Sequence, residues 1–516
     1  MSAAEAAQPH SSQPASAPAT APSELAAHLA TLAQRRGEVD LASAVLQVES
    51  ACDRSVDVKA HLAQIDKLAS GLRPLLGKHA SPQDRLTAMS DYLHRQKGII
   101  FDRSPKPADQ GQIHRLLKRD EGNCLAMVLL YVSLGQRLGL PLRVVAAPGH
   151  VFVRYDDGKT NFEIETTAKG RQLKIGQYLD ADGEVHDRPE WKYTKFYYRP
   201  LTPVEVVGVA AANQWISLHA RGRSAQAMEA LDLAVRLTPD APEPYLAMAT
   251  IAQQSRRPAD AARHCDKVIE LNPGIALAWR MKTQALLKLG RADDAVKTTS
   301  RAAVLFAAGG ASAPSSEPRT PPGTADEATA AAAVLSIHAY ALACAGQFDA
   351  AIDTADRALK LDGSDAYAHA ARGEALLGKK QPDKAAASFE KAISIEKRNV
   401  DWWIGRSRAL AGAGKTDDAM VALDKATALD RDSVDAWQAK LHLQLAAGKL
   451  VDAVDSCDGL IRITGGADVQ RQAQLLIERA KLHLAIKNSA KAAADAARAR
   501  QLGATLPAEL GDILKP

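Results

Sequence analysis

Cysteine and aromatic residues are scarce in this chain, and both shortages narrow what it can be. Five cysteines among 516 residues exclude a small scaffold held together by disulfides. Since the number is odd, at least one thiol has to stay free. Aromatic side chains make up 4% of the residues and alanine is abundant, so we expect thin helices that pack closely. The net charge of +5 is small for this length and argues against a dedicated nucleic-acid-binding protein, which normally presents a concentrated basic face.

Long apolar runs are also missing. No stretch reaches the ~18 residues that a membrane helix requires, and the nearest one, 330–346, contains Ser336 and His338. Residues 1–22 are rich in Ala, Ser and Pro and lack the basic start and apolar centre of a secretory signal, so we interpret them as a disordered tail. We therefore predict a cytoplasmic protein with no membrane contact.

The segment 23–200 mixes helical and strand patterns. Helical patterns cover about 23–36 and 40–51, and two more follow, marked by Leu62, Ile65, Leu68 and Leu72 and then by Leu86, Met89 and Leu93. The almost wholly apolar run 124–135 predicts a helix buried on all sides. Apolar runs at 142–147 and 151–155 predict strands, and 161–167 alternates after a turn signal, Asp157-Gly158. This mixture predicts an α+β domain.

From residue 201 to the end, the sequence is helical and repeats at a 34-residue interval. Pro239 and Pro273 lie 34 positions apart, and small alanines recur with the same step: Ala227, Ala261 and Ala295, then Ala351, Ala385, Ala419 and Ala453. The wider step from Ala295 to Ala351 matches a Gly/Pro/Ser-rich insert, 307–328, which we expect to be disordered. Ala492 has the same role in the last unit.

Such a unit of two helices resembles the tetratricopeptide repeat. Trp279, Trp403 and Trp437 occupy its early aromatic position, and a turn glycine follows in several units: Gly290, Gly346 and Gly414. The resemblance implies an all-α solenoid whose hairpins stack and form a concave groove. We count about eight hairpins over 201–516, with a capping helix at 506–514, and expect the groove to bind a protein or peptide.

One segment, 121–167, carries the chemistry. It places Cys124 at a helix start, His150 at a strand start and carboxylates on the next strand. That order suits a thiol nucleophile, because a helix N-terminus and an imidazolium both stabilise a thiolate. The imidazole can then protonate the leaving group while a carboxylate orients the ring.

The motifs GNCL, RLGLPL and PGHVFVRY in this segment resemble the SirB-type branch of the transglutaminase-like superfamily, over about 23–179. The resemblance implies a papain/transglutaminase-like fold in which Cys124 is the nucleophile and His150 the general base and acid. It implies Glu165 as the third member of the triad, with Glu163 as the runner-up. Asn123 is a candidate substrate or oxyanion contact, together with the backbone N–H of Cys124.

Two hypotheses from different classes follow. The first is a cysteine-dependent acyl-transfer or amide-hydrolysing enzyme of peptidase, deamidase or transglutaminase type, acting on a protein or peptide recruited by the repeats. The second is a non-catalytic scaffold, because the SirB-type branch includes members without the cysteine. No Cys-x-x-Cys or His-Glu-x-x-His motif is present, so we predict no metal and no cofactor. The other cysteines are expected in helix cores (Cys52, Cys265, Cys344 and Cys457), and two histidines at the surface or in loops (His94 and His114).

Overall fold

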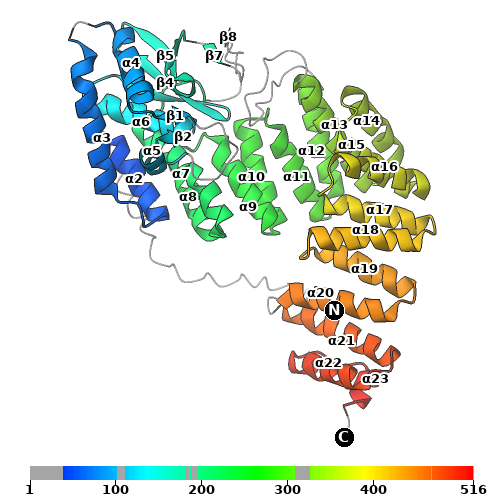
Figure 1. Cartoon of the computed structure of the whole chain (residues 1–516). Helices are drawn as coiled ribbons and strands as arrows, with labels where there is room; N and C mark the ends of the chain where they lie inside the picture. The colour runs from blue at the N-terminus through cyan, green and yellow to red at the C-terminus, as the bar shows by residue number, and fades with distance from the viewer. Residues whose placement is uncertain are drawn as a thin grey trace, which may run out of the picture. The chain divides into compact units, whose positions relative to one another are not determined.

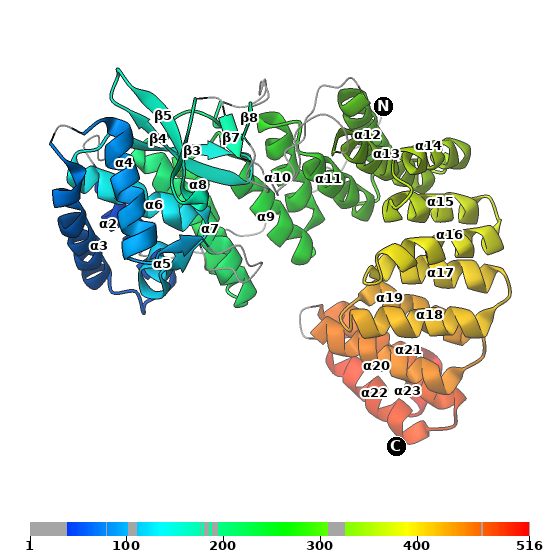
Figure 2. The same ribbon diagram turned by 45° about the horizontal axis from the view of Figure 1, so that its top comes forward.

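The computed structural model describes residues 39–78, 80–101, 111–175, 177–179, 185–187, 195–307, 326–465 and 468–514. They fall into two compact units, the first up to Pro244 and the second from Tyr245 (Figures 1 and 2). The expected tail, the helical pattern at 23–36 and most of the expected insert, 308–325, lie outside the described residues.

The first unit opens with six short helices, three of which begin at a capping side chain. They are α2 (Leu41–Cys52), α3 (Val58–Leu72), η1 (Arg73–Leu76), α4 (Pro82–Asp91), η2 (Tyr92–Gln96) and α5 (Ile113–Arg119). Asp40, Asp57 and Ser81 each accept a hydrogen bond from a backbone N–H in the first turn of the helix that follows. Of the seven residues that marked the predicted apolar faces, five are inaccessible to solvent (Ile65, Leu72, Leu86, Met89 and Leu93), and Leu62 and Leu68 are partly buried.

The helix α6 (Cys124–Leu138) runs through the centre of this unit. Every residue from Leu125 to Gly135 is buried, which confirms the prediction of a helix covered on all sides. It ends at Gly139, whose φ of 69° lies in the left-handed region that terminates helices. Strands β3 and β4 pack against one side of it.

The main sheet has four antiparallel strands in chain order: β3 (Leu142–Ala147), β4 (His150–Asp156), β5 (Asn161–Glu165) and β6 (Arg171–Leu173). Two small pairs flank it, β1 (Ile100–Phe101) with β2 (Glu121–Gly122) and β7 (Gln177–Leu179) with β8 (Val185–Asp187). Glu163 and Glu165 lie on the same face of β5, and both are buried. Their carboxylates have cationic partners inside the protein, which makes that burial tolerable.

A helical hairpin, α7 (Pro203–Ala220) and α8 (Ser224–Leu237), completes the first unit. This hairpin follows the 34-residue spacing of the repeats, and Ala227 is fully buried. However, α7 packs against α2, so the hairpin belongs to the first unit. The expected domain boundary at 200/201 therefore differs by one hairpin from the division seen at Pro244.

The second unit is a regular array of helices, and α9 (Pro242–Gln254) begins at the division between the units. The array continues with α10 (Pro258–Leu271), α11 (Ala276–Lys288), α12 (Ala292–Ala307), α13 (Asp326–Cys344), α14 (Phe348–Leu361), α15 (Ala366–Gly378), α16 (Pro382–Ile395), α17 (Val400–Gly412), α18 (Thr416–Leu429), α19 (Val434–Ala446), α20 (Leu450–Thr464), α21 (Val469–Ala485), α22 (Ser489–Gln501) and α23 (Ala508–Asp512). The fold is thus an α+β domain followed by an all-α array. None of the described helices is both long and apolar enough to cross a bilayer.

The repeated small residues are buried within the helical array. All eight recurring alanines, from Ala227 to Ala492, are at most 1% exposed. The repeated tryptophans fix the preceding loop, because each indole Nε1 donates to the carbonyl six residues earlier: Trp279 to Pro273 (2.7 Å), Trp403 to Lys397 (3.0 Å) and Trp437 to Arg431 (2.9 Å).

Ion pairs also recur from one hairpin to the next. In four junctions an acid on the second helix of a hairpin pairs with a base sixteen residues later, on the first helix of the following hairpin. The pairs are Asp266–Lys282 (2.7 Å), Asp356–Arg372 (3.2 Å), Glu390–Arg406 (3.6 Å) and Asp424–Lys440 (2.8 Å). We call these four pairs the junction ladder. Each is partly exposed, so each contributes at most about 1 kcal/mol.

Candidate active site

The candidate nucleophile begins the central helix. Asn123 caps α6, its Oδ1 accepting hydrogen bonds from the backbone N–H groups of Leu125 (3.0 Å) and Ala126 (3.3 Å). Cys124 therefore occupies the first helical position, and its side chain is half-buried. The partial positive charge of a helix N-terminus is directed at this position.

The candidate base lies at the start of the sheet's second strand. His150 follows a tight turn in which Gly149 has a φ of 67°, and it is the first residue of β4. Its Nε2 lies 2.8 Å from Oε2 of Glu165. The ring of Phe152 stacks against the imidazole, with centroids 6.5 Å apart. Because Nε2 faces Glu165, Nδ1 is the ring nitrogen available to Cys124.

The carboxylate that contacts His150 is held from two sides. Glu165 is the last residue of β5, and its Oε1 accepts hydrogen bonds from the backbone N–H (3.0 Å) and the hydroxyl (2.6 Å) of Thr167. Both oxygens are thus engaged, one by Thr167 and the other by His150. The side chain is 8% exposed, so its orientation is fixed by these contacts within the protein.

Electrostatics favour a charged pair at this position. Burial by itself lowers the pKa of His150, but the Glu165 carboxylate and the interaction with Cys124 outweigh it and raise that pKa well above its usual value. Burial likewise raises the pKa of Glu165, and His150 and Thr167 together bring it below its usual value. The expected state near neutral pH is an imidazolium beside a carboxylate.

The runner-up carboxylate has a different partner. Glu163 is 1% exposed, and its Oε1 lies 2.6 Å from Nη2 of Arg154. Arg154 also donates to the backbone carbonyl of Tyr198 (3.3 Å). Glu165 is therefore the carboxylate that contacts His150, and Glu163 is the one that pairs with Arg154. The side-chain oxygen of Asn123 caps α6, so only its amide nitrogen would be available to a substrate.

Two histidines predicted to be ordinary surface or loop residues are instead built into the domain, so that prediction was wrong. His114 is 5% exposed and its Nδ1 lies 2.6 Å from Oε2 of Glu49. That carboxylate also accepts the N–H groups that begin α5. The sequence feature that could have predicted this contact is Glu49, a charged residue within an apolar helical pattern. A carboxylate that is buried in this way needs a buried partner.

His94 belongs to a network behind the site. Its Nδ1 meets the carbonyl of Ile99 (2.8 Å), and its Nε2 meets the hydroxyl of Tyr131 (2.9 Å), which donates to Ser90 (3.1 Å). Gly170 packs against the same hydroxyls and donates its N–H to the carbonyl of Glu165 (3.0 Å). The network therefore supports the turn that follows Glu165. A tyrosine inside the apolar run of α6 was the available clue, because a buried phenol needs a partner.

The other four cysteines differ in exposure from Cys124 and from one another. Cys52, Cys265 and Cys457 are buried in helices as predicted, and desolvation raises the pKa of each thiol to about 12. Cys344 is exposed as a residue, so the prediction of core packing was wrong there. Its thiol is still desolvated enough to raise the pKa to about 11.

Comparison with protein families agrees with both parts of this architecture. The family model for the transglutaminase-like superfamily matches residues 59–208, and two tetratricopeptide-repeat models match residues 246–314 with 338–399 and residues 376–443. The chain thus carries a transglutaminase-like domain followed by tetratricopeptide repeats. The SirB-type branch is a finer assignment and stays a prediction.

Two of the similar solved structures are described as tetratricopeptide repeat proteins. A tetratricopeptide repeat protein from Parabacteroides merdae is 14% identical, with 53% of this chain and 97% of that chain covered and a TM-score of 0.29. YrrB, described as a repeat protein with an unusual peptide-binding site, is 19% identical, with 41% and 98% covered and a TM-score of 0.24. At TM-scores this low, neither likeness supports an inference about function. No curated protein matches the chain.

Proposed function

We propose that this protein is a cysteine-dependent acyl-transfer or amide-hydrolysing enzyme, of peptidase, deamidase or transglutaminase type, whose repeats recruit its protein or peptide substrate. The observation that supports this most strongly is the His150–Glu165 contact of 2.8 Å, in a domain whose Cys124 begins a buried helix. A carboxylate that holds Nε2 leaves Nδ1 to serve the thiol, which is the arrangement a thiol nucleophile needs.

In the proposed first half-reaction, the Cys124 thiolate attacks the carbonyl carbon of an amide. The tetrahedral oxyanion would face the N-terminus of α6, where the backbone N–H of Cys124 is a candidate donor. His150 then gives its proton to the departing nitrogen, the C–N bond breaks, and a thioester remains on Cys124. Glu165 stabilises the imidazolium before that transfer and keeps the ring oriented afterwards.

The second half-reaction decides the reaction class. His150, now neutral, takes a proton from water or from an amine as that group attacks the thioester carbonyl. The C–S bond breaks, and the thiolate and imidazolium are restored. Water gives hydrolysis or deamidation, and an amine gives a cross-link.

The proposal is tested by the pH dependence of iodoacetamide labelling at Cys124, read by peptide mass spectrometry in the full-length protein. We expect rapid labelling near pH ~6 that slows at least about tenfold in His150→Ala, because the imidazolium stabilises the thiolate. The four other cysteines are internal controls, and their raised pKa values predict little labelling at that pH.

The opposite result would be labelling of Cys124 only near pH ~8.5, the range of an ordinary thiol, with no effect of His150→Ala. The catalytic proposal would then be wrong, and the non-catalytic scaffold would replace it.

A further inference from the structure

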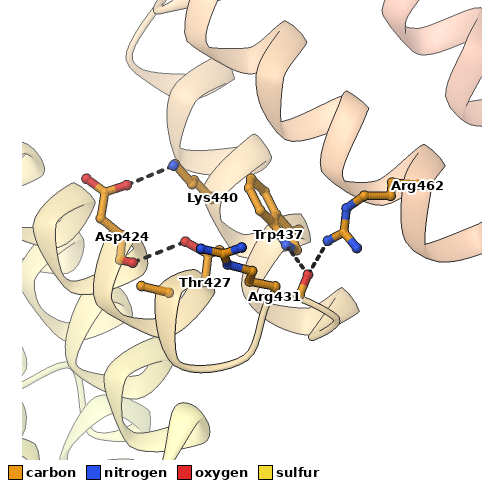
Figure 3. A pocket seen from close by; sticks show the side chains of 7 residues that line it. Asp424, Thr427, Arg431, Trp437, Lys440 and Arg462 are labelled. Atoms are coloured by element: carbon orange, nitrogen blue, oxygen red, sulfur yellow. Dashed lines mark hydrogen bonds and ion pairs between the residues drawn. The ribbon is translucent and has the colours of Figure 1, made fainter.

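A cavity of about 540 Å³ opens between successive hairpins of the repeat array. It lies where the end of α18, the loop to α19, the first turns of α19 and the end of α20 meet (Figure 3). Three cations and one indole reach into it, from Arg431, Lys440, Arg462 and Trp437. Asp424 is the one acid among the residues that form its wall.

The charges around this cavity are not fully balanced by one another. Lys440 Nζ pairs with Asp424 Oδ1 at 2.8 Å, and Arg462 Nη1 pairs with Oδ1 of the neighbouring Asp432 at 2.8 Å. For Arg431, no ion pair or side-chain hydrogen bond connects its guanidinium to any residue that the structure describes. One forked cation therefore stays available to an anion from outside the chain.

The indole and the second arginine are held in place by a shared acceptor. The backbone carbonyl of Arg431 accepts hydrogen bonds from Trp437 Nε1 (2.9 Å) and from Arg462 Nη2 (2.6 Å). Lys440 Nζ lies 5.3 Å from the centroid of the half-buried indole. These contacts fix the groups before any ligand arrives, which reduces the entropy lost on binding.

We propose that this cavity binds an acidic peptide segment of the partner protein, with a carboxylate on Arg431 and an adjacent apolar side chain against Trp437. Arginine offers carboxylates a bidentate fork, and tryptophan and arginine are the residues most enriched among binding hot spots in protein interfaces. The volume suits a few side chains rather than a whole folded surface. The inference deepens the recruiting role proposed above for the repeats, but it does not depend on the chemistry of Cys124.

The preceding hairpin provides a matched control. Thirty-four residues earlier, Trp403, Arg406 and Glu390 repeat the positions of Trp437, Lys440 and Asp424, and Lys397 stands where Arg431 does. Ala428 stands in place of Arg462, so the second arginine is absent. Lys397→Gln removes one positive charge at the equivalent exposed position, just as Arg431→Gln does at the cavity.

The test measures fluorescence anisotropy of a labelled ten-residue peptide of glutamates around two leucines, titrated with the full-length protein. We expect it to bind, to weaken as salt is raised, and to lose roughly five- to tenfold in affinity with Arg431→Gln. Lys397→Gln should leave the affinity within about twofold. Trp437→Phe should weaken binding less than Arg431→Gln, because the aromatic contact is kept.

Three results would overturn the inference: equal weakening by both Gln variants, equal binding of a peptide with lysines in place of the glutamates, or displacement of the acidic peptide by a single-stranded RNA oligomer at lower concentration. The last would assign the cavity to nucleic acid. Repeating the titration with Cys124→Ala separates this inference from the proposed catalysis, because peptide binding should be unchanged in that variant.

Discussion

Two glutamates two positions apart on one strand have unequal surroundings. Glu165 contacts an imidazole and a threonine, whereas Glu163 contacts a guanidinium that is charged at every ordinary pH. The first pair therefore loses a charge only when pH rises through the raised pKa of His150 or falls through the lowered pKa of Glu165.

Glu165→Gln should consequently destabilise the first unit in a pH-dependent way. The raised pKa of His150 contributes stability fully below about pH 6.5 and loses it as pH rises through the folded-state pKa. The lowered pKa of Glu165 contributes stability above about pH 4.3, and this stability is lost as pH falls through the folded-state pKa. The loss in free energy of unfolding relative to wild type should thus be largest between about pH 4.3 and about pH 6.5, at roughly 3 kcal/mol.

Hydrogen exchange of β4 and β5 peptides in urea, at pH ~5.5 and pH ~9, measures this difference in the relevant unit. Glu163→Gln is the control, because its partner Arg154 does not titrate in this range. A Glu165→Gln effect that stays constant or grows toward pH 9 would contradict the assignment of a charged pair.

At the scale of elements, the turn after β5 connects the candidate site to the rest of the domain. Gly170 has a φ of 77°, and a Cβ there would lie 2.0 Å from the hydroxyl oxygen of Ser90. The adjacent Tyr131 hydroxyl bonds His94, so the turn, α4 and α6 are packed at one point.

Gly170→Ala should therefore cost roughly 2–4 kcal/mol, from left-handed backbone strain of about 1 kcal/mol plus overpacking. Gly158→Ala is the matched control: its φ is 82°, but nothing lies within 4 Å of the added Cβ. It should cost only the backbone strain. Urea unfolding monitored by exchange in α6 compares the two, and equal costs would show that the packing around Gly170 is looser than described.

Most elements could be predicted from the sequence because they follow a period. The apolar run of α6 and the 34-residue recurrence of alanine identify their structures without knowledge of any neighbour. Contacts between distant segments carry no such period. A buried tyrosine needs a hydrogen-bond partner, but its sequence pattern does not identify His94 as the partner of Tyr131. Nor does any pattern indicate that Phe389 would fill the space beside Gly373 and Gly405.

The candidate site divides in the same way. Cys124 and His150 could be placed because a helix start and a strand start are local features. Choosing Glu165 over Glu163 depended on family resemblance, since both point to the same face of β5. The difference in their partners comes from Arg154 on the neighbouring strand, opposite Glu163 in the register. Burial of both carboxylates could not be predicted from the alternation of β5 alone.

At the scale of the whole molecule, stability in the repeat array depends on neighbouring hairpins. Each hairpin buries its apolar faces against the next one along the chain, so stability is expected to be a sum over units and junctions. A defect in the middle should therefore spread in both directions, and a defect at the end should stay local.

Replacing one of the recurring buried alanines by leucine tests this expectation. Ala419→Leu and Ala492→Leu should each lower the stability of the array by about 1–3 kcal/mol through overpacking. Hydrogen exchange should rise on both sides of α18 for the first variant, and only from α21 onward for the second. The first unit should be unaffected in both cases. A uniform rise over the entire chain would instead indicate a single cooperative folding unit.

The junction ladder has a consequence for how this chain can change in length. In every pair of the ladder, the acid and the base are sixteen positions apart. The second helix of each of these hairpins therefore presents a negative charge at the same position to the first helix of the next hairpin. Loss of the 34 residues 366–399 would set Asp356 opposite Arg406, again sixteen apart, and restore an equivalent junction. Because the ion pairs at these junctions are equivalent, a whole repeat can be inserted or deleted while the remaining junctions keep their contacts. The array can therefore lengthen or shorten over evolution by one repeat at a time.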